Sequence, residues 1–223
     1  MNPLHLQFGT GALALSWAAL VLVLIWAIWR VRWERIADWG FGRVWHGAIA
    51  FVVLLWSLKA SLRDGFTFHL LGIVATFLAL GLPLAITSAV LSVFVLAIIQ
   101  QAPFVNIAPT FFIMAAPAFA VGQFALWFVE KRLPPHMFVY LFGAAFAGAG
   151  LSIAAVVPIS LFTWSQFSDR SFFRVMGDYL PIAIQLGFAE AVLTGMLITI
   201  GVVYKPHWIS TFDDARYLFA RKD

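Results

Sequence analysis

Long apolar runs, separated by short breaks that carry most of the charges, dominate the pattern of this sequence. Runs such as Gly11–Ile28, Leu82–Ile99 and Pro181–Tyr204 contain almost no ionisable side chain. A helix of roughly 17–25 apolar residues crosses a bilayer whose hydrocarbon core is about 30 Å thick. The pattern therefore predicts an all-α integral membrane protein whose helices are surrounded by lipid.

We expect the apolar runs to form a bundle of about seven transmembrane helices. The third and fourth runs are short and meet at the turn Gly81–Pro83, where glycine ends one helix and proline starts the next. One long kinked helix over both runs is the alternative, and it would reduce the count to six. The expected spans are 11–31, 43–60, 67–81, 83–101, 107–131, 135–163 and 179–204.

The basic residues are distributed unequally between alternate breaks. Ten of them share one set of breaks and four share the other. Because cytoplasmic loops are enriched in Lys and Arg, we expect the N-terminus outside and the C-terminus in the cytoplasm. The cytoplasmic set is Arg30, Arg32, Arg35, Arg43, Lys131, Arg132, Lys205, Arg216, Arg221 and Lys222, and the outside set is Lys59, Arg63, Arg170 and Arg174.

Composition agrees with a membrane protein. Hydrophobic residues make up 63% of the 223 positions and charged residues 11%, whereas soluble domains contain roughly 45–50% and 25%. We expect one transmembrane domain over residues 1–204 and a cytoplasmic tail over 205–223, in a multi-pass protein of the bacterial inner membrane. The net charge of +4 arises from the basic breaks, so it does not indicate nucleic-acid binding.

Several classes of function are excluded or disfavoured. The chain has no cysteine, which excludes disulfides and thiolate metal sites. It has no glycine-rich phosphate loop, so any ATP hydrolysis must come from a partner. No nucleophile–base pair is visible, so we expect neither an enzyme nor an intrinsic cofactor.

Among the polar residues of the last apolar run, we expect three to be buried: Glu190, Thr194 and Gln185. A carboxylate at the centre of a membrane costs about 2.5–3.5 kcal/mol on insertion scales. Glu190 shares a helical face with Gly187 and Thr194, which leaves room for a partner. Two interpretations stay open: a structural hydrogen bond to a neighbouring helix, or a polar step for a cargo.

A divalent metal is the cargo that the histidines favour. His69 opens the third run near its outer end, and imidazole is a common ligand of transition metals. His5 in the N-terminal segment and the amide Asn106 before the fifth run are candidate co-ligands. The alternative is that His69 is a hydrogen-bonded anchor at the membrane interface.

Small residues recur at four-residue spacing in the last two runs. Examples are Gly150 with Ala154, and Gly187 with Ala191 and Gly195. Such stripes allow close approach of helix backbones. They predict packing within the bundle or, alternatively, a docking face for another membrane subunit.

Three segments, in order along the chain, resemble the CbiM/NikM family, whose members are the substrate-capture membrane components of cobalt and nickel energy-coupling-factor transporters. Gly65–Gly72 is similar to the family's Gly-Thr-Ser-Gly-His-Leu-Leu-Gly motif, with His69 on its histidine. Val105–Ala115, which contains Asn106 and Met114, is similar to a second motif. Gly187–Thr194 is similar to the family's last span, with Glu190 on its glutamate.

The resemblance implies uptake of Co²⁺ or Ni²⁺ together with a second transmembrane coupling subunit and cytoplasmic ATPases. In the family the metal is bound by the N-terminal amine, a backbone nitrogen and an imidazole at the second residue, and by the motif histidine. Of these ligands, only the motif histidine has a counterpart in this chain, which is His69. This chain begins Met1-Asn2-Pro3, and Pro3 has no N–H to lose, so His5 is the candidate substitute. The alternative function is a non-transporting subunit that stabilises a larger membrane complex.

Overall fold

The computed structural model describes residues 3–37, 39–61, 67–168 and 171–217, and these are almost wholly helical. Within these ranges, six helical stretches are long and apolar enough to cross a membrane. The prediction of an all-α, multi-pass integral membrane protein is therefore confirmed. The stretches are α1 (Thr10–Arg30), α3 (Trp39–Ser57), α5 (Leu82–Ile99), Phe104–Arg132 with α6 (Ile107–Thr110) and α7 (Ala116–Arg132), Met137–Ser165 with α8 (Met137–Val139) and α9 (Gly148–Ser165), and α10 (Phe172–Tyr204).

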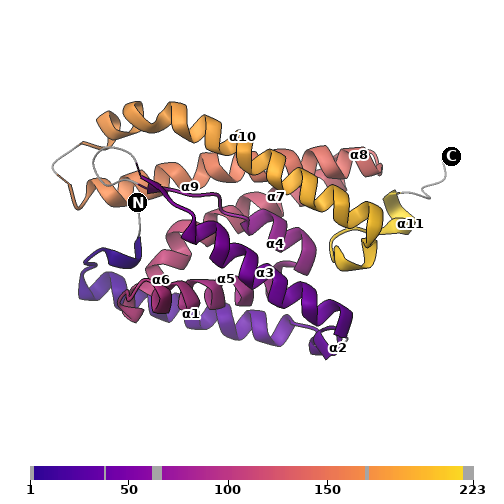
Figure 1. Cartoon of the computed structure of the whole chain (residues 1–223), viewed down its shortest axis with the longest axis horizontal. Coiled ribbons are helices and arrows are strands. Elements are labelled where there is room, and N and C mark those ends of the chain that lie inside the picture. Colours follow the sequence, from indigo (N-terminus) through magenta and orange to yellow (C-terminus); the bar gives the residue numbers. More distant parts are fainter. Residues whose placement is uncertain (1–2, 38, 62–66, 169–170, 218–223) are drawn as a thin grey trace.

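Short elements lie at the two ends of the bundle (Figure 1), whose N-terminus and C-terminus are at opposite ends. We call the N-terminal end the outer end and the arginine-rich opposite end the inner end, following the charge bias. The outer elements are a 3-10 turn Pro3–His5, the antiparallel pair β1 (Ala60–Ser61) and β2 (Thr67–Phe68), and a 3-10 turn Phe104–Asn106. The inner elements are α2 (Trp33–Ala37), a 3-10 turn Pro206–Trp208 and α11 (Asp214–Tyr217).

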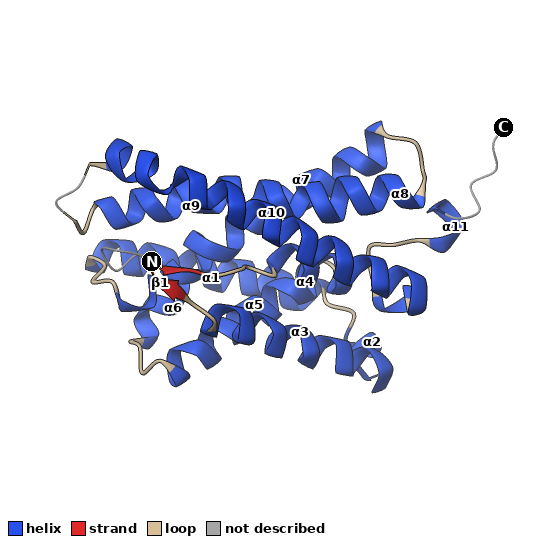
Figure 2. Cartoon of the chain, turned by 45° about the horizontal axis from the view of Figure 1, so that its top comes forward, coloured by secondary structure: helices blue, strands red, loops and turns tan. Residues whose placement is uncertain are grey.

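The third expected span is not a continuous helix, and this detail of the prediction was wrong. It begins as β2 and an extended loop, and becomes helical only at α4 (Ile73–Leu80). A helix of 8 residues is too short to cross a bilayer alone. α4 is almost completely buried and contacts α5, α7 and α10 (Figure 2). The chain therefore crosses here as a loop followed by a half-helix.

The alternative of one long kinked helix over the third and fourth runs is also excluded. α4 ends at Gly81, whose φ of 79° lies in the left-handed region that favours glycine. α5 begins at the next residue and has Pro83 in its first turn, where a missing N–H costs nothing. Two separate helices thus meet at the inner end.

The small-residue stripes pack within the bundle. A Cβ added at Gly150 would lie 3.3 Å from the backbone oxygen of Gly187, and one added at Gly187 would lie 3.3 Å from that of Gly150. α9 and α10 therefore approach backbone to backbone at this point. Gly195 lies similarly close to Phe146. These contacts agree with the packing interpretation.

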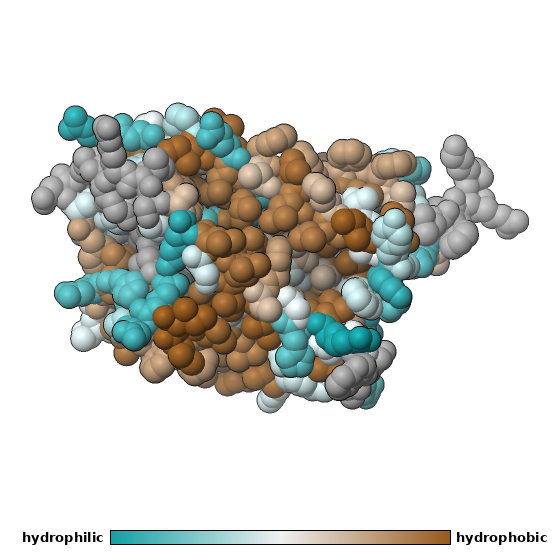
Figure 3. Space-filling model, viewed as in Figure 1, coloured by the Kyte–Doolittle hydropathy of each residue, from teal (hydrophilic) through white to brown (hydrophobic). Residues whose placement is uncertain are grey.

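Apolar side chains cover the middle of the surface, and polar side chains gather towards both ends (Figure 3). Many large apolar residues on α1 and α10 are exposed, among them Leu15 at 74% and Ile184 at 67%. Such exposure would be unfavourable in water but is expected for helices that face lipid.

Candidate functional site

The loop that carries His69 is fixed by a carboxylate from the other end of the sequence. Glu190, on α10, is 0% exposed. Its two oxygens accept hydrogen bonds from the backbone N–H groups of Leu71, at 2.8 Å, and Gly72, at 2.7 Å. These N–H groups precede α4 and have no partner within a helix. One side chain therefore caps the half-helix and satisfies two buried donors that lipid could not.

Local sequence makes this loop possible. Gly72 is the N-cap of α4 and has φ of 65°, a left-handed conformation that side chains with a Cβ rarely adopt. A Cβ there would also lie 2.7 Å from atoms of Leu55 and Phe51 on α3. Trp56, also on α3, donates its indole N–H to the Leu71 carbonyl at 2.9 Å. Glycine, glutamate and tryptophan together hold the loop in one conformation.

His69 lies against the ring of Trp56, with ring centroids 5.1 Å apart. Its Nδ1 is 3.1 Å from the carbonyl oxygen of Leu70. A carbonyl can only accept a hydrogen bond, so this contact places a proton on Nδ1 and leaves Nε2 with a lone pair. In this tautomer a neutral imidazole can bind a metal ion through Nε2.

A small cavity of about 10 Å³ lies beside this imidazole. A volume of roughly 10–15 Å³ accommodates one water molecule, so the cavity has the scale of a single small ion or water. It lies between the N-terminal turn, α3, α5 and α6 and the π-helical turn Phe111–Ala115. Its polar lining consists of Lys59, His69, Gln100, Thr110 and Met114.

Two of these residues come from the irregular part of the fifth span. Thr110 is 1% exposed, and its hydroxyl has no hydrogen-bond partner in the described structure. Met114 lies in the π-helical turn, a feature often found at functional sites. Its sulfur accepts a hydrogen bond from Ser160 at 3.4 Å. Both residues line the cavity, and their side chains carry an oxygen and a sulfur that could act as donor atoms.

A cation of the protein itself also lines this cavity. The ammonium group of Lys59 donates to the amide oxygen of Gln100 at 2.7 Å. Partial burial lowers the pKa of Lys59 from its ordinary value. The contact joins the end of α3 to the end of α5 at the outer mouth.

The other expected ligands lie elsewhere. The Asn106 amide donates to the carbonyls of Leu4, at 2.9 Å, and Leu6, at 2.7 Å, and so fixes the N-terminal segment at the outer end. His5 is exposed and is not part of the cavity lining. Among the described residues, no group of three His, Asp or Glu side chains could hold a metal ion.

The three polar residues expected inside the last span divide into two groups. Glu190 and Thr194 are both 0% exposed, and the Thr194 hydroxyl has no hydrogen-bond partner in the described structure. Gln185, expected to be buried, is instead exposed on α10. With 3.6 residues per turn, a residue five positions before Glu190 lies on the far side of the helix.

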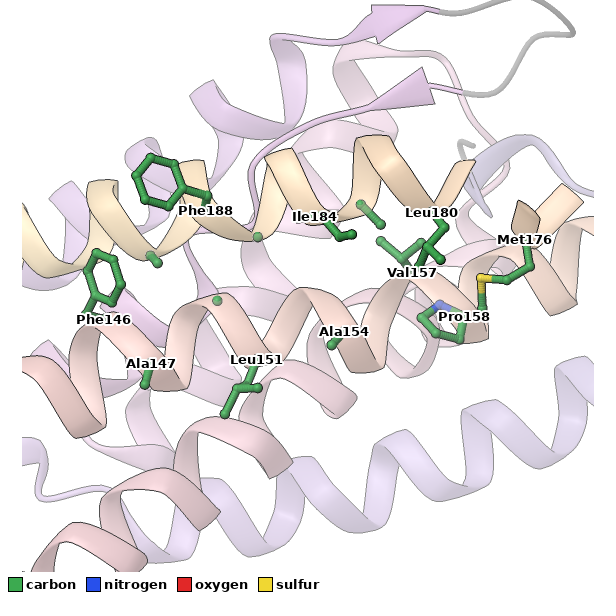
Figure 4. Close-up of a pocket in the computed structure, with 14 residues that line it drawn as sticks. Phe146, Ala147, Leu151, Ala154, Val157, Pro158, Met176, Leu180, Ile184 and Phe188 are labelled. Atoms are coloured by element: carbon green, nitrogen blue, oxygen red, sulfur yellow. The ribbon is translucent and has the colours of Figure 1, made fainter. Parts of the chain in front are cut away.

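A separate, apolar groove between α9 and α10 has a volume of about 540 Å³ (Figure 4). It is lined by residues such as Phe146, Leu151, Pro158 and Ile184, and by no ionisable side chain. No imidazole, carboxylate, amide or hydroxyl side chain of the described residues lines it, so its lining does not resemble a site for a divalent cation.

Sequence reasoning missed most of the cavity lining. Thr110 and Met114 gave no ligand-like spacing, although Pro109 and Pro117 on either side of them indicated an irregular helix. In the sequence, Lys59 is notable only as one of the basic residues that indicate the orientation of the helices in the membrane. Its contact with Gln100 spans 41 positions and has no local signature.

The fold and the cavity together define a multi-pass membrane protein with a histidine-lined cavity near its outer end. The family model described as "CbiM: Cobalt uptake substrate-specific transmembrane region" matches residues 8–208. The chain therefore belongs to the CbiM family, a family of transport components rather than enzymes. No curated protein and no solved structure matches the chain significantly.

Proposed function

We propose that this protein is the membrane component that captures a divalent first-row metal ion, with cobalt favoured, for an energy-coupling-factor transporter. The family match supports cobalt uptake. The main structural support for the proposed metal site is the ion-sized cavity beside His69. Glu190 fixes the loop that contains this histidine.

In this proposal, Nε2 of His69 is the principal ligand. Thr110 and Met114 supply weaker oxygen and sulfur donors from the other side of the cavity. Glu190 is a positioning residue, because both its oxygens bond to the backbone of the loop rather than face the cavity. Asn106 positions the N-terminal segment, of which Pro3 and Leu4 line the cavity.

The chain contributes no ATP-binding motif, so transport requires partners. A second transmembrane coupling subunit and cytoplasmic ATPases would drive release of the ion at the inner end. α4 supports such coupling, because it connects the His69 loop to the inner end, where Ser210 and Thr211 bond to its last carbonyls. Movement of the inner end would therefore reach the metal site through one rigid half-helix.

Metal binding by the purified protein tests this proposal. Calorimetric titration with Co²⁺ should show affinity falling roughly 10- to 100-fold in His69→Ala, which removes the principal ligand. His207→Ala, which removes an exposed imidazole at the inner end, is the matched control and should bind normally. If His69→Ala bound every divalent first-row ion with unchanged affinity, His69 would not be a metal ligand and the proposed site would be wrong.

The alternative function, a non-transporting subunit of a larger complex, is favoured by one observation. Lys59 places a positive charge at the cavity, and this charge opposes a divalent cation. Isolation of the tagged protein from native membranes separates the two functions. Co-isolated ATPases support transport, whereas a stable complex that contains no ATPase supports the alternative.

A further inference from the structure

A second polar cavity lies at the inner end of the bundle, opposite the outer end that carries His69. It has a volume of about 230 Å³ and is lined by Arg30, Arg32 and Arg35 together with Ser210. We call it the arginine cavity. These three arginines come from the end of α1, the following connection and α2.

One of these arginines is held in place by the protein. The Arg35 guanidinium lies 4.5 Å from the ring centre of Phe41 and donates to the Ser210 hydroxyl at 3.3 Å. A planar guanidinium fixed in this way keeps further N–H groups for a planar or tetrahedral anion. Arg35 is therefore preorganised towards the cavity.

The positive charge of the cavity is not neutralised by the described part of the chain. No carboxylate among the described residues forms a salt bridge with Arg30, Arg32 or Arg35. Burial, and next the charge of Arg32, lower the pKa of Arg35. Like charges held together in this way favour an anionic occupant.

The position of the cavity indicates which anion. Arg30 directly follows the apolar run of α1, and the exposed indoles of Trp29 and Trp33 flank it, as aromatic side chains do at the bilayer interface. Apolar residues such as Phe41 and Leu80 complete the wall of the cavity. A phospholipid combines the same two kinds of group, an anionic phosphate and a hydrocarbon chain.

We infer that the arginine cavity binds the phosphate of an anionic phospholipid from the inner leaflet. Basic pockets between transmembrane segments on the cytoplasmic side are suited to such headgroups. The bound headgroup would contact Gly81, in the turn between α4 and α5, and Ser210 of the C-terminal segment. It would therefore stabilise the inner end of the half-helix that leads to His69.

The test compares nanodiscs of phosphatidylcholine alone with nanodiscs that contain equal parts of phosphatidylglycerol and phosphatidylcholine. Native mass spectrometry should show phosphatidylglycerol retained on the wild-type protein, together with a higher unfolding temperature in the mixed discs. The Arg30→Gln/Arg32→Gln variant should retain roughly tenfold less, because two charge-assisted contacts are lost. Both arginines are exposed, so this variant keeps the packing of Arg35.

Lys131→Gln/Arg132→Gln is the matched control, since it removes two exposed charges from the same end outside the cavity. It should retain phosphatidylglycerol like the wild type. Equal loss in both variants would overturn the proposal, because it would indicate a diffuse charge effect. Displacement by millimolar glycerol phosphate would also overturn it in favour of a soluble anion. Arginine-dependent binding of a coupling subunit without any lipid retention would overturn it in favour of a protein partner.

Discussion

The two ends of α4 are held in different ways. At the outer end, one buried carboxylate from Glu190 accepts from two backbone N–H groups, at 2.8 and 2.7 Å. At the inner end, Ser210 and Thr211 donate backbone N–H groups to the carbonyls of Ala79 and Leu78, and the Thr211 hydroxyl adds a bond of 2.8 Å to Leu78. Neither end of this half-helix can rely on water.

The difference separates a functional end from a structural one. The outer end depends on a single ionisable side chain and on a left-handed glycine, and it carries His69. The inner end distributes its bonds over backbone groups and a hydroxyl, and the rings of Tyr140, Phe212 and Tyr217 pack against one another next to Thr211. Damage at the outer end should therefore reduce both stability and equilibrium metal binding, whereas damage at the inner end should reduce stability and coupling to partner subunits and leave metal binding by the isolated protein unchanged.

The largest effect is expected for Glu190→Leu. Two buried N–H groups would lose their acceptors, at a cost of about 1–3 kcal/mol each. The free energy of unfolding in detergent should fall accordingly, and cobalt affinity should fall with it. Glu190→Gln keeps one carbonyl acceptor and should be intermediate in both measurements. Wild-type stability in Glu190→Leu would show that the cap does not hold α4.

The next effect distinguishes the two glycines that flank α4. Gly72 is in the left-handed helical region, and Gly81, with φ of 79° and ψ of 157°, is in a region essentially restricted to glycine, so alanine at either position should cost about 1–3 kcal/mol in backbone strain. Gly72→Ala should cost more than Gly81→Ala, because its Cβ would lie 2.7 Å from Leu55, whereas at Gly81 the nearest atom is 3.9 Å away.

Chemical denaturation of both glycine variants measures this order. Gly47→Ala, on α3 with nothing within 4 Å of the added Cβ, is the control and should be neutral or slightly stabilising. Equal losses for the two flanking glycines would mean that the contact with α3 has no energetic role.

A smaller effect is expected for Thr211→Val at the inner end. It removes the donor to Leu78 and the partner of the Tyr140 hydroxyl, at about 1 kcal/mol. Cobalt affinity should be unchanged, which distinguishes this end from the outer one. Thr199→Val, whose hydroxyl bonds only within α10, is the control for stability. A loss of cobalt affinity in Thr211→Val would show that the inner end of α4 also helps to fix the metal site.

The smallest effect is expected for Lys59→Met, which removes the positive charge at the cavity. Cobalt affinity should rise roughly two- to fivefold, because a partly solvated charge repels the ion only weakly. Lys59→Arg keeps the charge and should bind like the wild type. If both variants bind alike, the lysine does not oppose the ion.

The sequence predicted the long helices well because hydropathy and length determine them. α1 and α5 coincide closely with their apolar runs. The segment before α4 was expected to be helical, because an apolar stretch has the same hydropathy whether it is extended or helical. Gly72 was the local signal that a helix starts there rather than at His69.

The site was less predictable because its parts come from distant positions. Glu190 stood out as a lone buried carboxylate, but its partners lie 118 and 119 positions away and are backbone groups, which no sequence pattern marks. Gln185 differs from Glu190, because it is a polar residue of the same apolar run but lies on an exposed face of α10. Helical periodicity relative to Glu190 would have placed it outside.

The most direct test of the central claim is an X-ray absorption spectrum of the cobalt-loaded protein. The account predicts the multiple-scattering signature of an imidazole ligand in the wild type and in His207→Ala, and its loss in His69→Ala. An unchanged imidazole signature in His69→Ala, at equal metal occupancy, would contradict the account, because the ion would then be bound somewhere else.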